Sequence, residues 1–151
     1  MSSIDAPTRS LVEPAEIETV IRANTGIPGR PAFEVVEVGA QVIDIRLPYD
    51  KSMTRLGDTI SGPVMMAAAD AAMYAVIIAH VEHGQYAVTS HLNIEFLRRP
   101  EPGDLYVRAH ILKLGRRFIP CRVELFAADR QTLVAHVAGA YALMRAPTTS
   151  A

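Results

Sequence analysis

The sequence predicts an α+β domain in which one long central helix is wrapped by a curled antiparallel sheet of about five to six strands. The first observation is the run 61–81, which is rich in Ala and Met and is apolar or small from Val64 to Ala79 except at Asp70 and Tyr74. The second is a series of alternating apolar and polar runs after residue 85, separated by short turns. A helix can cover only one face of such a sheet, so a curled sheet is the simplest arrangement.

The helix has a recognisable start. Ser61 can accept a hydrogen bond from the first turn, and Pro63 stands where a missing N–H costs nothing. A helix that is apolar on nearly all sides is normally buried on nearly all sides. Because Asp70 interrupts the run, and a membrane span needs about 20 strongly apolar residues, we expect the core helix of a soluble domain, ended near His83-Gly84.

The remaining elements follow from periodicity. We expect a short amphipathic helix over 13–24 that ends near Gly26, a connector at 28–31, a hairpin over 33–48 that turns at Gly39-Ala40, a polar loop over 49–59, and strands at 86–97, 104–114, 118–127 and 132–144. Alternation along the first of these four strands divides its side chains between two faces. One face has Val88, Leu92, Ile94 and Phe96, and the other has Thr89, His91, Asn93 and Glu95.

Composition limits the class of protein. The 151 residues suit one domain, and 50% hydrophobic residues suffice for a core. We divide the chain into a lead-in with a short helix (1–32), the main domain (33–145) and a flexible tail (146–151). A net charge of −1 argues against a nucleic-acid or anionic membrane surface. Residues 1–14 show no signal-peptide pattern, so we expect a cytoplasmic protein.

Metal chemistry has little support in the sequence. Cys121 is the single cysteine, which excludes an internal disulfide and a CxxC site, and we expect it in the core. The histidines are scattered without metal-ligand spacing, so we expect no metal; they are His80, His83, His91, His110 and His136.

Asp70 is the residue that demands an explanation. An unpaired ionised carboxylate inside an apolar helix is very costly, so it must be paired, hydrogen-bonded, protonated or directed at a site. One interpretation is a satisfied polar residue at a subunit contact. The other, which we favour, is a catalytic carboxylate.

Several motifs occur in a characteristic order. The segment 55–63 leads into Ala69-Asp70, the strand 88–100 ends in Phe96-Leu97-Arg98-Arg99-Pro100, and Gly103-Asp104, Gly115-Arg116 and the strand from Ala135 to Tyr141 follow. Over about residues 33–145, this arrangement resembles the PaaI-type acyl-CoA thioesterases of the hotdog-fold superfamily. The resemblance implies a hotdog fold and hydrolysis of an acyl-CoA to free acid and CoA.

The resemblance also implies roles for individual residues. Asp70 corresponds to the catalytic carboxylate, which acts as a base on water or as a nucleophile. Gly62 corresponds to the glycine whose N–H polarises the thioester carbonyl, which agrees with the positive potential of a helix N-terminus. Thr89 corresponds to a Ser/Thr that orients the water or carboxylate, here expected from the partner chain of a dimer.

The sequence departs from the family at three positions. Ser61, Pro63 and Arg55 stand where the family has His, Gly and Asn. If Arg55 pointed inward, it could pair with Asp70 and weaken it as a base. These departures motivate an alternative, a hotdog protein that binds acyl-CoA without hydrolysing it. An enoyl-CoA hydratase or dehydratase is a third alternative, but it needs an acid/base His near the helix, and none stands in the matching place.

The substrate is expected to contact residues around the helix. We expect Arg55, Ser61 and Pro63 to bind it, and Met65, Met66 and Met73 to line an adaptable acyl pocket. Arg98 and Arg116, with their neighbours Arg99 and Arg117, either contact CoA phosphates or are solvated turn charges. No nucleotide-binding motif is present, so CoA is expected only as part of the substrate. We expect a homodimer that assembles into a homotetramer.

Overall fold

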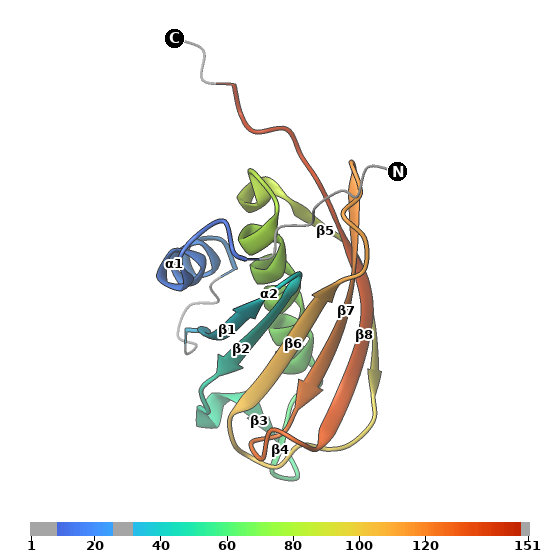
Figure 1. Ribbon diagram of the computed structural model, residues 1–151. Helices are drawn as coiled ribbons and strands as arrows, with labels where there is room; N and C mark the ends of the chain where they lie inside the picture. The colour runs from blue at the N-terminus through green and yellow to red at the C-terminus, as the bar shows by residue number, and fades with distance from the viewer. Residues whose placement is uncertain (1–8, 26–31, 149–151) are drawn as a thin grey trace.

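The computed structural model describes residues 9–25 and 32–148 (Figure 1). Most of the expected lead-in (1–8), the connector and the expected helix stop at Gly26 (26–31), and the end of the tail (149–151) lie outside the described residues. The elements are α1 (Pro14–Thr25), β1 (Glu34–Gly39), β2 (Val42–Leu47), η1 (Lys51–Met53), β3 (Thr54–Arg55), β4 (Thr59–Ile60), α2 (Gly62–His80), η2 (Gly84–Tyr86), β5 (Val88–Phe96), β6 (Leu105–Ile111), β7 (Phe118–Phe126) and β8 (Leu133–Ala142).

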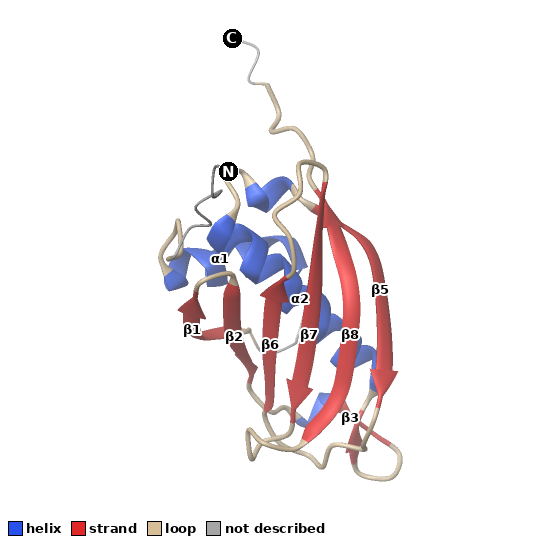
Figure 2. Ribbon diagram, turned by 45° about the vertical axis from the view of Figure 1, so that its right-hand side comes forward, coloured by secondary structure: helices blue, strands red, loops and turns tan. Residues whose placement is uncertain are grey.

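The sheet has six antiparallel strands in the order β1-β2-β6-β7-β8-β5, and it curls around α2 (Figures 1 and 2). The expected fold class is therefore confirmed. Strands β1 and β5 form the two edges. The first hairpin turns at Ala40-Gln41, one residue later than expected, with Gln41 in the left-handed region.

Helix α2 is the core of the molecule. Ser61 is its N-cap, and the Ser61 Oγ accepts from the Val64 N–H at 3.4 Å. Every residue from Ala71 to His80 is buried. By length and mean hydropathy (1.6) α2 could cross a membrane, yet 72% of that apolar window is buried inside the fold, as in a core helix.

Two short elements complete the fold. Helix α1 buries Ile17 and Ile21 in the same core as α2, so it belongs to the domain and is not merely part of a lead-in. The loop after β2 contains η1 and the β3–β4 ribbon, which pattern reasoning did not predict, because strands of two residues are too short to show alternation.

The end of α2 differs from the expectation. The helix ends at His80 with Val81 as its C-cap, so Gly84 is not the capping residue. Instead, η2 folds back so closely that a Cβ on Gly84 would lie 2.7 Å from the Ile77 carbonyl oxygen. Gly84 is therefore required for a close approach of backbone to backbone.

His80 fastens this end of α2 to the β1–β2 hairpin. The His80 Nδ1 lies 2.8 Å from the Val76 carbonyl oxygen. Its Nε2 lies 2.8 Å from the Gly39 carbonyl oxygen and 3.1 Å from the Gln41 amide nitrogen. All of these partners are backbone groups, so the contacts of His80 indicate a structural role.

Strand β5 contains a β-bulge at Ser90. Thr89 pairs with Tyr141 and His91 pairs with Ala140, which leaves Ser90 without a counterpart. The extra residue reverses the faces before it. Thr89 therefore joins Leu92, Ile94 and Phe96 on the inner face, and Val88 lies on the outer face. The expectation from simple alternation was wrong for Thr89 and Val88.

Candidate functional site

Asp70 lies in the middle of α2 and is partly buried. Its Oδ1 accepts a hydrogen bond from Thr89 Oγ1 at 2.7 Å and another from Tyr141 Oη at 2.8 Å. Tyr141 Oη also lies 3.1 Å from the backbone oxygen of Asp70. The carboxylate that the sequence required to have partners is thus hydrogen-bonded, and both donors converge on one of its two oxygens.

Thr89 and Tyr141 face each other across β5 and β8. The bulge at Ser90 is what turns Thr89 toward the helix. Thr89 contacts Asp70 of its own chain, so the expectation that it reaches this carboxylate from a partner chain is corrected.

Tyr141 was missed as a site residue. In the sequence, Tyr141 stands out only as the end of a strand motif. A signal existed, because a tyrosine on the inner face of an otherwise small and aliphatic strand must find a partner for its hydroxyl.

The ring of Tyr141 is 3% exposed and stacks on Tyr74, with centroids 5.9 Å apart and planes 12° from parallel. The Tyr74 hydroxyl donates to the Gln85 carbonyl at 2.7 Å. Burial raises the pKa of Tyr141, and the negative charge of Asp70 raises it further, by a smaller amount. The phenol therefore stays protonated and acts as a donor toward Asp70.

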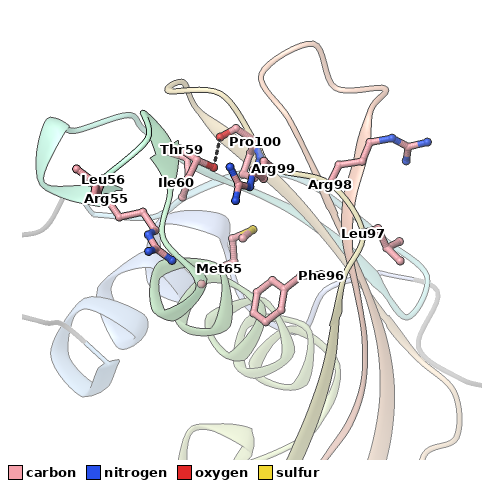
Figure 3. Close-up of a pocket in the computed structure, with 11 residues that line it drawn as sticks. Arg55, Leu56, Thr59, Ile60, Met65, Phe96, Leu97, Arg98, Arg99 and Pro100 are labelled. Atoms are coloured by element: carbon pink, nitrogen blue, oxygen red, sulfur yellow. Dashed lines mark hydrogen bonds between the residues drawn. The ribbon is translucent and has the colours of Figure 1, made fainter.

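A pocket of about 450 Å³ opens at the N-terminus of α2, about two helical turns before Asp70 (Figure 3). Thr59 Oγ1 donates to the Pro100 carbonyl at 2.9 Å and ties the β3–β4 ribbon to the loop after β5. The lining residues are mostly apolar or cationic and include no carboxylate. They are Arg55, Leu56, Thr59, Ile60, Gly62, Met65, Phe96, Leu97, Arg98, Arg99 and Pro100.

The three arginines of the pocket are oriented differently. Figure 3 shows the Arg55 and Arg99 guanidinium groups directed toward the space around Met65 and Phe96. The Arg98 side chain is directed away, and its Nη1 donates to the Leu133 carbonyl at 3.0 Å.

Gly62 brings a backbone donor to the pocket wall. In the first turn, Pro63 has no N–H, and the Val64 and Met65 amides donate to Ser61 Oγ and to the Ser61 carbonyl. The Gly62 N–H makes no hydrogen bond with the residues that the structure describes. It is a donor at the positive end of a helix, as an oxyanion site requires.

The polar residues that differ from the family have separate positions. Ser61 caps the helix, and Pro63 is exposed in its first turn. Arg55 lines the pocket, and within the described part of the chain it forms no ion pair with Asp70. Within one chain, no contact therefore supports the possibility that Arg55 makes Asp70 a weaker base.

Other predicted residues lie outside the pocket. Arg116 lies in the turn between β6 and β7, at the opposite end of the sheet (Figure 1). Cys121 is a buried core residue, as expected, and burial raises its pKa to about 12.

The three methionines of the predicted acyl pocket are separated. Met65 lines the pocket, whereas Met66, 43% exposed, does not. Successive helix residues point about 100° apart, which explains the difference. Met73 is completely buried, and its Sδ would lie 2.8 Å from a Cβ on Gly139. Met66 and Met73 therefore do not line the pocket at the start of α2.

The site within one chain consists of two separated parts. Gly62 and Asp70 are eight residues apart on one helix, which is about 12 Å along its axis. One thioester group cannot contact both in the same chain.

A long central helix wrapped by a six-stranded antiparallel sheet defines the hotdog fold. The sequence profile of the thioesterase superfamily matches residues 57–134, more than half of the chain. The chain therefore belongs to the thioesterase superfamily, whose reaction is thioester hydrolysis, and the resemblance inferred from its motifs is confirmed.

Solved structures agree with this assignment. The fold matches a candidate thioesterase from Silicibacter sp. TM1040 with a TM-score of 0.79 and 29% identity, over 91% of this chain and 96% of that one. It matches zebrafish thioesterase superfamily member 2 (TM-score 0.74, 20% identity, 88% and 99% covered). It also matches PaaI from the phenylacetic acid degradation operon of Escherichia coli, with a TM-score of 0.68 and 18% identity, over 85% of this chain and 91% of that one. These last two likenesses concern the fold alone.

A curated sequence relative agrees as well. Thermoplasma acidophilum Ta0293, named as a candidate esterase, is 27% identical over 97 residues, which cover 64% of this chain and 71% of that protein.

Proposed function

We propose that this protein hydrolyses an acyl-CoA thioester to a free acid and CoA. The observation that carries the proposal is Asp70, whose Oδ1 accepts two hydroxyl donors while its Oδ2 has no hydrogen bond from the described residues. A carboxylate with one oxygen fixed and the other available is suited to act as a base or a nucleophile. Membership of the thioesterase superfamily supplies the reaction class.

The reaction follows from the groups present. Asp70 Oδ2 takes a proton from water as the water oxygen attacks the carbonyl carbon, or it attacks that carbon itself. The carbonyl oxygen becomes an oxyanion, which the Gly62 N–H stabilises. The C–S bond then breaks, and in the base route the departing CoA thiolate takes up the proton held by Asp70. In the nucleophilic route, the C–S bond breaks as the acyl group is left in a mixed anhydride with Asp70. Water then cleaves this anhydride to the free acid and the Asp70 carboxylate, and the proton released from that water goes to the thiolate.

A homodimer would unite the two parts of the site. Strand β5 is an edge strand, and its terminal residues Val88 and Phe96 are 49% and 50% exposed. Two β5 strands paired antiparallel about a two-fold axis would bring the Val88 end of one protomer to the Phe96 end of the other. Asp70 and Thr89 of one chain would then approach the Gly62 pocket of its partner, which gives two shared sites.

The pocket chemistry supports CoA as the carrier of the acyl group. Arg55 and Arg99 offer planar guanidinium forks, which suit phosphate oxygens, and no lining carboxylate competes for them. The apolar side chains Ile60, Met65 and Phe96 suit the pantetheine arm or the acyl group.

The test is thiol release from a panel of aliphatic and aryl acyl-CoAs, with wild type and Asp70→Asn side by side. We expect turnover by wild type and a loss of about a hundredfold or more in the variant, because the amide keeps the shape but cannot take a proton. Glu37→Gln, an exposed change on β1, is the matched control and should keep full activity. Unchanged turnover in Asp70→Asn would refute the role of Asp70. Tight acyl-CoA binding without turnover by wild type would favour the binding-protein alternative.

A further inference from the structure

Tyr141 has a feature that core packing does not require. Its ring is buried on the inner face of β8, and a buried phenol needs an acceptor. A backbone carbonyl would serve that need, as Gln85 does for the hydroxyl of Tyr74. The acceptor nearest to the Tyr141 hydroxyl is instead Oδ1 of Asp70, at 2.8 Å, closer than the Asp70 backbone oxygen at 3.1 Å.

The two donors on Asp70 leave its oxygens unequal. Thr89 and Tyr141 both donate to Oδ1, and a carboxylate oxygen has two lone pairs, so this oxygen is saturated. Oδ2 receives no hydrogen bond from any residue that the structure describes. The carboxyl group is thereby fixed in rotation about its Cβ–Cγ bond, with a defined oxygen left for chemistry.

The packing of Tyr141 fixes its hydroxyl relative to the helix. Its ring stacks on Tyr74, which stands one helical turn after Asp70 on α2. The ring therefore packs against the same helix whose carboxylate it binds. Tyr74 is itself anchored through its hydroxyl to the Gln85 carbonyl.

We propose that Tyr141 is a positioning residue that holds Asp70 through Oδ1 and presents Oδ2 to the thioester. This inference rests on the proposed function and adds a residue to it. Tyr141 is only 3% exposed, whereas Asp70 is partly exposed, so Tyr141 acts through Asp70. Its contribution belongs to the chemical step, and substrate binding does not depend on it.

The first test compares Tyr141→Phe with wild type in acyl-CoA hydrolysis. Phe keeps the ring and its stacking on Tyr74 and removes the hydroxyl, with its contacts to Asp70 and Thr89. We expect kcat to fall about tenfold or more with KM unchanged, since one hydrogen bond to a charged group is lost. Tyr106→Phe, on the outer face of β6 beside Arg130, is the matched control and should match wild type.

A second readout is independent of turnover. The carboxyl carbon of Asp70, labelled with ¹³C and assigned by its absence in Asp70→Asn, is observed by NMR at one fixed pH. Its chemical shift should differ between Tyr141→Phe and wild type, because the carboxylate loses one of the two donors on Oδ1, and it should be unchanged in Tyr106→Phe. If wild type hydrolyses no acyl-CoA, the proposed function fails while a changed chemical shift still supports the role of Tyr141. The role is overturned if the chemical shift in Tyr141→Phe is that of wild type, even if kcat falls, since a loss of kcat without it indicates a structural effect alone.

Discussion

The central helix carries one carboxylate and one imidazole, Asp70 and His80, within the same apolar surroundings. His80 is 3% exposed, and each of its contacts is a backbone group, on its own helix and on the β1–β2 hairpin. Asp70 is partly exposed, and its donors are the side-chain hydroxyls of Thr89 and Tyr141. Both ring nitrogens of His80 have hydrogen-bond partners, whereas Asp70 Oδ2 has none among the described residues.

This difference in hydrogen bonding indicates a structural role for His80 and is suited to a chemical role for Asp70. A buried polar group that is fully paired with backbone stabilises one arrangement of the chain. A group held by side chains on one atom, with its other atom available, is fixed in place yet can still react. Hydrogen bonds compensate the free-energy cost of desolvation at both residues, so the presence of hydrogen bonds alone does not distinguish them.

The largest expected effect tests the structural side of the comparison. His80→Ala should lower the free energy of unfolding by about 2–4 kcal/mol, because it removes a buried side chain and its hydrogen bonds to part-buried backbone groups of the hairpin. Urea denaturation measures this loss, and turnover per folded molecule should be unchanged. Asp70→Asn keeps an acceptor oxygen for the two hydroxyls, so its loss should be smaller, about 1 kcal/mol. Equal destabilisation by both variants would abolish the distinction.

The second prediction tests whether Asp70 is only one part of a shared site. In the proposed homodimer, Asp70→Asn should be inactive because it removes the proposed base. Gly62→Leu should be inactive because it adds a branched side chain to the pocket wall, where a Cβ alone already lies 3.4 Å from the Phe96 ring. After unfolding, mixing and refolding, activity should rise to about a quarter of wild type, since half of the dimers are mixed and each has one intact site. Persistent inactivity despite exchanged subunits would mean that both residues act within one chain.

A smaller effect is expected at Thr89. Thr89→Val keeps the shape and removes one of the two donors on Oδ1, so kcat should fall about tenfold at unchanged KM. Ser90→Ala is the control, because the bulge residue has no cross-strand counterpart. If the two variants behaved alike in steady-state kinetics, the contact between Thr89 and Asp70 would have no part in turnover.

The smallest effect is expected at the other end of the helix. Arg99→Ala should raise KM about fivefold at low salt and leave kcat unchanged, and the difference should shrink as salt screens the phosphate contact. Arg122→Ala, an exposed cation on the outer face of β7, is the control. A KM that does not respond at low ionic strength would remove Arg99 from the binding surface.

Most of the fold was predictable because strong local patterns agree with it. The Ala- and Met-rich run predicted α2, and alternation predicted the strands of the sheet. The hydrogen bonding of Asp70 was predictable as well, since a carboxylate in such a helix must have partners. The end of α2 was not, because Gly84 suggests a cap in sequence while its real role is a close approach to Ile77.

The remaining parts of the site depend on tertiary contacts. Tyr141 looks like any core aromatic until its hydroxyl is seen against Asp70. Met73 fits a pocket by residue type, yet it fills the space left by Gly139 on the facing strand. The face of Thr89 depends on one unpaired residue, which a pattern of period two cannot reveal.

That unpaired residue, Ser90, has a consequence for comparing relatives of this protein. A relative with a regular strand would have its site hydroxyl one position nearer to Leu92 in sequence, although the hydroxyl would occupy the same place in space. An alignment without a gap would then match that hydroxyl with Ser90 and assign Thr89 to a neighbouring column. Since Ser90 also carries a hydroxyl, the error would look like agreement. The alignment of this strand therefore needs a one-residue gap at the bulge.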